Sequence, residues 1–380
     1  MSECGLRPGG ESSDRSGGRG GRGRRRLILL GCLLLVVLAS VPLLRQCTAP
    51  PAAAPPWVFA ACDVGQGDAL FLATGPHAAI AVDTGPDPDR EDACARDLGI
   101  TEVPLLILTH FHADHVDGLP GLVRGRSIGR IETTTVDDPP SGAALVARVA
   151  SAAQIPVARV VPDEQRTLGA IGWRVLWPQA EHPLRAPTGS MRSGPPGAGR
   201  AAGEGMVEDG PGEDPGPNND SIVMAVTVRA ASGALRLLLT GDIETPVQRI
   251  LLADREPFLR ADVLKVPHHG SANQEPGFLA AVRPSVSVIS VGAGNPYGHP
   301  ASRTVYLAGQ DGARVYRTDR DGTVLISAPA GADDPIPVRA DRGDGVLPTQ
   351  DPSPGGSSAG HGRSRHGGRH RRPEHEPAGS

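Results

Sequence analysis

Residues 109–118 read Thr-His-Phe-His-Ala-Asp-His-Val-Asp-Gly and directly follow the apolar run VPLLIL at positions 103–108. Three imidazoles and a carboxylate therefore stand at the end of a predicted strand: His110, His112, Asp114 and His115. In an extended segment His110 and His112 point to the same side, and the turn that follows can bring the other two beside them. Neutral imidazoles and carboxylates suit Zn²⁺ or Mn²⁺, and two ions about 3.5 to 4 Å apart can share such a cluster. The pattern predicts a metal site.

Further strand ends carry residues of the same kind. The run LLLTGD at 237–242 ends in Asp242, and LKVPHHGS at 264–271 supplies His268 and His269. An earlier run, VDTG at 82–85, contributes Asp83. Open α/β sheets collect their sites along one edge, so these residues are expected to converge, with Asp242 placed to bridge two metals.

Short β-type runs alternate with polar turns and helical segments from Trp57 onward. This alternation predicts an α/β fold with mixed sheets. The expected strands are 58–62, 69–73, 79–82, 103–108, 222–228, 235–239, 263–266, 286–291 and 324–326. The expected helices are 92–98, 119–125, 142–153, 245–253, 276–282 and 302–308.

An apolar run from residue 27 to residue 44 is just long enough to span a bilayer. Residues 1–26 hold seven arginines against three acidic residues, so the positive-inside rule places them in the cytoplasm. We predict a basic disordered segment (1–26), a transmembrane helix (27–45) and a proline-rich linker (46–56), followed by an extracytoplasmic domain. The expected location is the cell membrane, with a single pass. A cleaved signal peptide is the alternative.

The expected hydrolase domain covers residues 57–334. Within it, residues 178–219 are rich in Gly, Pro and Glu without apolar periodicity, which predicts a disordered insertion. Residues 335–380 are expected to form a disordered Gly-, Arg- and His-rich tail. The domain holds 23 of the 38 basic and 34 of the 42 acidic residues, a net charge of −11 with neutral histidines. Such a field does not indicate a general affinity for phosphate backbones.

Five cysteines include no C-x-x-C pair, which excludes a cysteine zinc knuckle and a thioredoxin motif. Outside the cytoplasm Cys62 and Cys94 could form a disulfide. We expect two buried free thiols instead.

These motifs closely resemble the metallo-β-lactamase fold superfamily and, within it, the hydrolase domain of the ComEC family of competence proteins for DNA uptake. The resemblance covers roughly residues 57–328. Its blocks are CDVGQGDA (62–69), VDTG (82–85), THFHADHVDG (109–118), NNDSIV (218–223), LLLTGD (237–242), LKVPHHGS (264–271) and NPYGHP (295–300). It implies a four-layer αββα sandwich. The H-x-H-x-D-H pattern alone identifies only the superfamily, whereas the DVGQGDA, HHGS and YGHP blocks together are more specific to ComEC and to related phosphodiesterases such as choline-phosphate esterases.

The resemblance also implies roles for single residues. His110 and His112 would hold a first metal, Asp114 and His115 a second, and Asp242 would bridge. Asp83 would brace the site from behind. His269 would complete the second metal's ligands, while His268 and Glu244 would face the substrate.

The pattern departs from the superfamily at one ligand. The third histidine expected before the bridging aspartate is missing, since His182 lies in the predicted insertion. Asp220 stands in its place and could serve as an oxygen ligand, with turn capping as the alternative. Weaker first-metal binding or a preference for Mn²⁺ would follow.

Three further positions have two interpretations each. Lys265, the only lysine of the chain, could steady a phosphate oxygen or point away from the site. His299 is expected near the active site, with an ordinary turn histidine as the alternative. Asp63 and Asp68 are expected to shape a glycine turn rather than to bind metal.

The implied function is that of a phosphodiesterase or nuclease with two divalent metal ions, Zn or Mn, acting on DNA in competence-related uptake. Asp114, Asp242, Glu244, His268, His299 and Lys265 are its candidate catalytic residues, with His268 or His299 protonating the leaving group. A separate membrane channel protein is a possible partner. The alternatives are a small or lipid head-group diester as substrate, or a non-catalytic metal-binding scaffold. Hydrolysis of β-lactams fits the HHGS and DVGQGDA blocks poorly.

Overall fold

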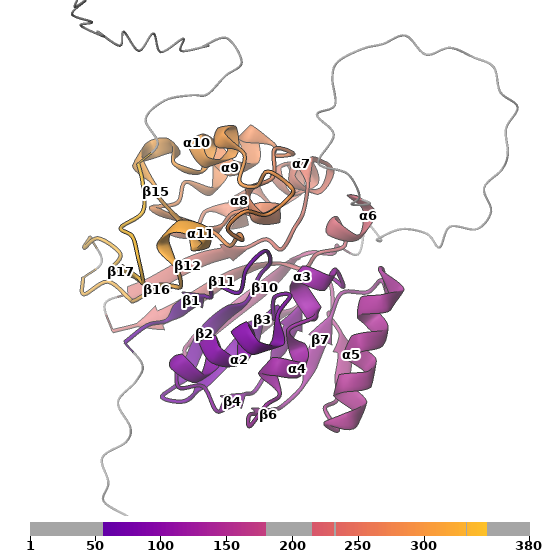
Figure 1. The fold of residues 1–380 in the computed structure, drawn as a ribbon. Coiled ribbons are helices and arrows are strands. Elements are labelled where there is room, and N and C mark those ends of the chain that lie inside the picture. Colours follow the sequence, from indigo (N-terminus) through magenta and orange to yellow (C-terminus); the bar gives the residue numbers. More distant parts are fainter. Residues whose placement is uncertain (1–55, 180–214, 232, 332, 348–380) are drawn as a thin grey trace, which may run out of the picture. The chain divides into compact units, whose positions relative to one another are not determined.

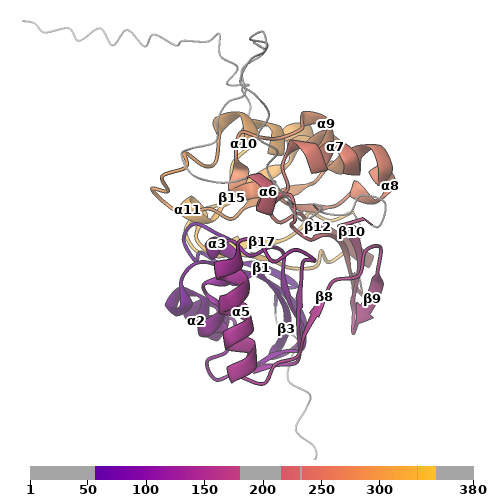
Figure 2. The ribbon, with the colours of Figure 1, turned by 90° about the vertical axis from the view of Figure 1, so that its right-hand side faces the viewer.

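Two mixed β-sheets face each other, and helices cover their outer surfaces (Figure 1, Figure 2). This computed structural model describes residues 56–179, 215–231, 233–331 and 333–347. Within these residues the layers follow the expected order of helices, sheet, sheet and helices. The predicted α/β fold with mixed sheets is confirmed.

The first sheet joins antiparallel and parallel strands. Its order is β17 (Val338–Ala340), β16 (Val324–Ile326), β1 (Phe59–Ala61), β2 (Leu70–Gly75), β3 (Ala78–Val82), β5 (Leu106–Leu108), β7 (Ile131–Thr133) and β8 (Val157–Arg159). The short β4 (Glu102–Val103) pairs with β3, and the short β6 (Ser127–Ile128) pairs with β4. The strands from β3 to β8 run parallel. The helices on its outer face are α2 (Pro88–Asp97), α3 (Ala113–Val116), α4 (Leu119–Leu122) and α5 (Pro140–Ala152).

The second sheet is also mixed. Its order is β15 (Arg314–Arg317), β14 (Val286–Ile289), β13 (Val263–Lys265), β12 (Gly233–Leu239), β11 (Val223–Ala230), β10 (Ile171–Trp177) and β9 (Gln165–Leu168), and β12 to β15 run parallel. The helices of this half are α6 (Pro215–Asn218), α7 (Thr245–Asp254), α8 (Glu256–Leu259), α9 (Pro276–Val282), α10 (Ser302–Ala308) and α11 (Thr318–Asp321). Two short 3₁₀ turns cover Pro267–Gly270 and Gln310–Gly312.

The period of two along each strand divides the core into layers. In β2, Leu70 and Leu72 pack between the sheets, whereas Phe71 packs against the helices. In β12, Leu237 and Leu239 face the first sheet, and Leu238 packs under the helices of the second half. Both faces of these strands are buried, which explains their nearly continuous apolar sequences.

Strand ends from both sheets meet at one edge. The parallel pair β3 and β5 ends at Val82 and Leu108, just before Asp83 and His110. The parallel pair β12 and β13 ends just before Asp242 and the His268–His269 pair. Parallel neighbours end on the same side of a sheet, so the fold delivers the predicted residues to one place.

Each predicted strand and helix overlaps an observed element, most with shifted ends, but the predicted strand at 103–108 is divided into β4 and β5. Sequence reasoning missed β6 to β10, β15 and β17, which are short strands with the exception of β10.

Two predicted boundaries need correction. The tail does not begin at residue 335, because β17 pairs with β16 in antiparallel register and Val346 pairs with Val315. The insertion does not extend to residue 219, because α6 is part of the fold and the Trp177 indole donates to the carbonyl of Asn219 at 2.8 Å.

The predicted segments at 1–26 and 27–45, and nearly all of the linker at 46–56, lie outside the described residues. Among the residues that the structure describes, every helix is too short or too polar to cross a bilayer.

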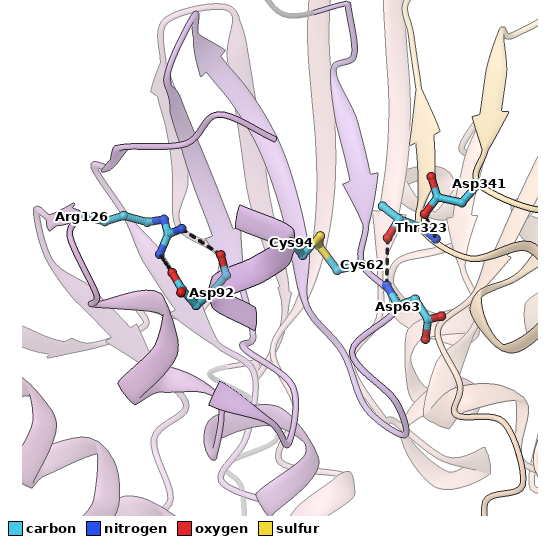
Figure 3. Close-up of a disulfide and its surroundings, with 7 residues drawn as sticks. All are labelled: Cys62, Asp63, Asp92, Cys94, Arg126, Thr323 and Asp341. Carbon is cyan, nitrogen blue, oxygen red and sulfur yellow. Dashed lines mark hydrogen bonds and ion pairs between the residues drawn. A yellow bond between two sulfur atoms is a disulfide. The ribbon is translucent and has the colours of Figure 1, made fainter. Parts of the chain in front are cut away.

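The prediction of two free thiols is wrong, because Cys62 and Cys94 form a disulfide (Figure 3). Their Cα atoms lie 6.2 Å apart although 32 positions separate them in the sequence. Cys62 follows β1 directly, and Cys94 lies on α2, which packs against the same sheet. The contact comes from helix packing, which the cysteine spacing does not encode.

Candidate metal centre

Four side chains from three strand ends converge on one point. Asp114, His115, Asp242 and His269 each offer a ligand atom, and these atoms all lie within 4.8 Å of one another. Three of the four residues are buried, and Asp114 is partly exposed. The structure thus brings together four of the predicted metal ligands.

The distances show how the donors face each other. Nε2 of His269 lies 2.9 Å from Oδ2 of Asp242 and 3.1 Å from Oδ2 of Asp114. Nε2 of His115 lies 3.1 Å from the same oxygen of Asp242. Imidazole nitrogens and carboxylate oxygens that converge in this way are a suitable donor set for Zn²⁺ or Mn²⁺, and Asp242 Oδ2 is the shared atom. These residues therefore fit a divalent metal ion.

A second pair of imidazoles lies beside this cluster. Nε2 of His110 is 3.1 Å from Nδ1 of His112, and the His110 and His115 rings have centroids 4.1 Å apart. The hydroxyls of Thr109 and Ser221 lie 3.2 Å from Nδ1 of His110, on the opposite side of its ring. The predicted ligands of the first metal are thus adjacent to those of the second.

Asp220 is buried, and the residue that follows it, Ser221, contacts His110. The Ser221 hydroxyl also accepts a hydrogen bond from the backbone N–H of Asp242 at 2.9 Å. A role of the Asp220 carboxylate as an oxygen ligand stays a prediction.

Asp83 contacts the His115 imidazole on the side away from the other ligands. Its carboxylate accepts hydrogen bonds from the backbone and the hydroxyl of Thr109, both at 2.7 Å, and lies 2.9 Å from Nδ1 of His115. The second ring nitrogen of a metal-binding histidine usually has such a partner, which fixes the ring and its tautomer. Asp83 lies where the predicted bracing role requires it.

The backbone around the ligands adopts left-handed conformations. His268 has φ 47° and His269 has φ 50°, and Asp83 has φ 60°. Non-glycine residues in this region cost of order 1 to 3 kcal/mol each and persist only where packing holds them. Here the N–H of His268 donates to the carbonyl of Gly241 at 3.2 Å, which ties the turn to the Asp242 loop. The pair of left-handed residues turns both imidazoles inward.

Glu244 and His268 belong to a buried polar network beside the four ligands. They are only 3% and 2% exposed. The Glu244 carboxylate accepts hydrogen bonds from the amides of Asn218 at 3.1 Å and Asn273 at 2.7 Å, and Nδ1 of His268 lies 3.5 Å from it. Each oxygen of Glu244 thus accepts an amide donor, and the predicted contact of Glu244 with the substrate stays a prediction.

His299 is close to this network, as predicted. Its ring centroid is 5.2 Å from that of His268 and 5.8 Å from that of Tyr297. Sequence reasoning gave no role to Asn218, although it lies in the NNDSIV block, or to Asn273, because amides carry no distinctive ligand pattern.

Lys265 and Asp68 differ most from expectation. Lys265 is fully buried, and its ammonium is paired with the Asp68 carboxylate. It therefore has no open surface on which to bind a substrate phosphate, and the predicted phosphate contact is wrong.

Asp68 is also fully buried and lies 3.4 Å from Nδ1 of His269, so it does more than shape a turn. The sequence signal for this pair was the position of Lys265 at the end of an apolar strand, because a buried ammonium needs an acidic partner. Asp63, in contrast, pairs at the surface with Arg342 at 2.7 Å.

The electrostatics of the cluster favour positive charge. Burial, with His115 as a second cause, lowers the pKa of His110 well below its usual value, which keeps it neutral as a ligand must be. Burial opposes protonation of His115 and His269, but Asp242 and its neighbouring carboxylates outweigh it and raise the pKa of both imidazoles. Burial would raise the pKa of Asp242, yet His115, His269 and Lys265 together lower it. The carboxylates thus remain ionised around a place that attracts a cation.

Residues 62–292 match the family model described as the metallo-beta-lactamase superfamily. Among curated proteins, the chain is 27% identical over 285 residues to ComE operon protein 3 of Bacillus subtilis (strain 168), a match that covers 69% of this chain and 32% of that protein. It is 33% identical over 108 residues to Competence protein ComA of Neisseria gonorrhoeae, covering 28% of this chain and 16% of that protein. The chain thus matches a third or less of the length of these relatives.

Among solved structures, the metallo-beta-lactamase fold protein YhfI from Bacillus subtilis aligns with a TM-score of 0.36 at 11% identity, over 60% of this chain and 84% of that one. The Rm3 metallo-beta-lactamase aligns with a TM-score of 0.34 at 14% identity, over 58% of this chain and 79% of that one. Likenesses this distant do not bear on substrate or reaction.

Proposed function

This chain belongs to the metallo-beta-lactamase superfamily, and from that premise we propose that it is a hydrolase with two divalent metal ions that cleaves phosphodiesters, with DNA as the substrate class. The observation that carries the proposal is the convergence of Asp114, His115, Asp242 and His269 beside the His110–His112 pair. Six imidazole or carboxylate ligands at one sheet edge are more than a single ion needs.

Divalent ions at such a site act as Lewis acids and lower the pKa of water. The chain's own residues supply the rest. Asp242 offers one oxygen to both imidazoles, His115 and His269, which supports a bridging position. His268 and His299 lie together next to the ligands and are the residues that can transfer a proton to the leaving oxygen. Nδ1 of His268 lies 3.5 Å from the Glu244 carboxylate, which supports a role of Glu244 in stabilising the protonated imidazole.

DNA as substrate is supported by the sequence blocks that resemble the ComEC family of competence proteins for DNA uptake, and the matches to ComE operon protein 3 and Competence protein ComA agree with that resemblance. The net charge of −11 over residues 57–334 favours a second candidate, a small diester such as a lipid head group, because an acidic surface repels a phosphate backbone.

The location is also part of the proposal. We propose that the apolar segment at 27–45 anchors the chain in the cell membrane and that the hydrolase domain lies outside the cytoplasm. The Cys62–Cys94 disulfide supports this, since disulfides persist in oxidising compartments and are rare in the cytosol. A separate membrane channel protein remains the proposed partner.

The test uses the purified full-length chain loaded with Mn²⁺ or Zn²⁺. Bis-p-nitrophenyl phosphate, single-stranded DNA and the β-lactam nitrocefin are offered as substrates. We expect turnover of the first two and none of nitrocefin. Turnover of the small diester alone would favour the second candidate. Two bound metals without turnover of any substrate would reject the enzyme in favour of a metal-binding scaffold.

A further inference from the structure

The only lysine of the chain is buried under the metal centre. Lys265 ends strand β13, and its side chain points into the space between the sheets, as does that of Val263 two residues before it. Its ammonium is paired with Asp68, donates to the carbonyl of Gly241 at 3.2 Å and lies 3.5 Å from Oδ1 of Asp242. An ammonium has three N–H donors, and three acceptors surround it. Its hydrogen-bonding capacity is therefore used inside the protein.

This arrangement gives the two oxygens of Asp242 different partners. Oδ1 faces Lys265 at 3.5 Å, whereas Oδ2 faces Nε2 of His269 at 2.9 Å and Nε2 of His115 at 3.1 Å. A carboxylate without such a neighbour can turn and present either oxygen, or both. The ammonium on one side and the imidazoles on the other leave Oδ2 as the oxygen presented to the ligand cluster.

Asp68 links the same ammonium to two other ligands. Its carboxylate lies 3.4 Å from Nδ1 of His269, and its backbone N–H donates to the carbonyl of Asp114 at 3.2 Å. Asp68 and Lys265 are both fully buried, and buried charges persist where they are paired. The pair therefore contacts His269, Asp114 and Asp242 at once.

We propose that Lys265, anchored by Asp68, is a positioning residue of the metal centre. It holds Asp242 so that a single oxygen, Oδ2, faces both imidazoles of the ligand cluster. The inference rests on the metal-binding part of the proposed function and assigns a residue that the ligand pattern does not contain. It does not depend on the substrate.

The experiment measures metal binding by the full-length chain in the absence of substrate. The protein is freed of metal with a chelator and titrated with Mn²⁺ by calorimetry, and the visible spectrum of the Co²⁺-loaded protein reports the coordination. Lys265→Met keeps the length of the side chain and removes its charge. Leu264→Ala is the matched control, because Leu264 is the preceding residue of β13, is equally buried and packs on the opposite side, under the helices.

We expect Lys265→Met to weaken Mn²⁺ binding about 10- to 100-fold, the usual effect of losing an outer partner of a ligand, and to change the Co²⁺ spectrum. Leu264→Ala should lower stability and leave both readouts unchanged. Equal losses in the two variants would reduce Lys265 to a structural role and overturn the inference. Mn²⁺ binding by Lys265→Met that is unchanged or tighter would do the same, since it would show that the ammonium only repels cations.

If Lys265→Met does not fold, Asp68→Asn takes its place, because it releases the ammonium from its anchor and should weaken Mn²⁺ binding as well. Wild-type affinity in Asp68→Asn would overturn the proposal. A wild-type chain that binds metal and turns over no phosphodiester rejects the proposed function alone. A wild-type chain that binds no metal rejects both.

Discussion

Each buried imidazole of the centre uses its two ring nitrogens differently. Nδ1 of His115 faces Asp83 at 2.9 Å, Nδ1 of His269 faces the carbonyl of Ser290 at 2.8 Å, and Nδ1 of His110 faces two hydroxyls. In all three residues Nε2 is the atom turned toward the other ligands. Partners on Nδ1 hold each ring so that Nε2 is the atom available to a metal, which fixes the orientation of the rings for binding.

Asp242 is the residue whose loss should matter most. Asp242→Ala removes the oxygen that two imidazoles share, and phosphodiester hydrolysis should fall by more than the roughly 100-fold that loss of an outer partner costs. Circular dichroism should show an intact fold. Asp89→Ala, which changes an exposed aspartate on α2, is the control and should keep full activity. Wild-type turnover by Asp242→Ala would refute the ligand assignment.

Glu91 on α2 provides a prediction away from the metal centre. It is fully buried, and its carboxylate oxygens have no hydrogen-bond partner among the described residues. Burial raises its pKa well above the usual value, although the nearby Arg126 partly opposes the shift. The folded chain therefore keeps a proton that the unfolded chain loses near pH 4.5, so stability falls as the pH rises above that value.

The substitution Glu91→Gln removes this loss of stability at rising pH, because a glutamine side chain does not ionise. At pH 7 the variant should be more stable than the wild type, because glutamine has no proton whose retention in the folded chain costs stability, and near pH 4 the two should be alike. Urea denaturation at both pH values, with chelator present throughout, measures the difference. Equal stability at pH 7 would show that the carboxylate is solvated.

At the scale of elements, the loop between β1 and β2 is pressed against the ligand turn. Gly67 in this loop has φ +138°, and a Cβ built on it would lie 2.1 Å from the carbonyl oxygen of Asp114. The next residue, Asp68, donates its N–H to the same oxygen. Backbone rather than a flexible side chain is in the way, so the contact leaves no room for a methyl group.

Gly67→Ala should therefore shift the Asp114 turn as well as strain the loop. We expect a loss of about 1 to 3 kcal/mol in the free energy of unfolding, and weaker Mn²⁺ binding. Gly125→Ala is matched, because Gly125 also has a positive φ, of +67°, but an added Cβ would meet nothing within 4 Å. It should lower stability and keep the wild-type affinity for Mn²⁺. Equal Mn²⁺ affinity in both variants would show that the loop between β1 and β2 does not affect metal binding.

At the scale of the whole molecule, the negative net charge of the domain opposes binding to a polyanion such as DNA. Residues 57–334 carry a net charge of −11 with neutral histidines. Proteins that make 6 to 10 phosphate contacts lose roughly 10³ to 10⁵ in affinity for DNA between 50 and 200 mM salt.

The full-length chain should show a much smaller dependence, with less than about a tenfold change in its dissociation constant for single-stranded DNA over that range of salt. Fluorescence anisotropy with a labelled oligonucleotide measures it. A steep loss of affinity would show that the chain presents a basic surface to DNA, which the net charge of the domain does not indicate.

The sequence by itself determined the class of the fold and the candidate ligands that the structure brings together. Apolar runs that end in His or Asp, such as 103–108 before His110 and 237–239 before Asp242, are local signals. A strand exposes its end to the sheet edge wherever the rest of the chain lies, so a ligand at a strand end can be recognised from its neighbours alone.

Only the tertiary structure decided which distant residues touch. The Lys265–Asp68 pair, the Cys62–Cys94 disulfide and the contact of Glu244 with Asn218 and Asn273 each join segments with no shared local pattern. Strand β17 likewise depends on a partner, β16, rather than on its own composition. Such contacts arise from the packing of one element on another, and packing depends on the whole set of buried surfaces rather than on any window of sequence.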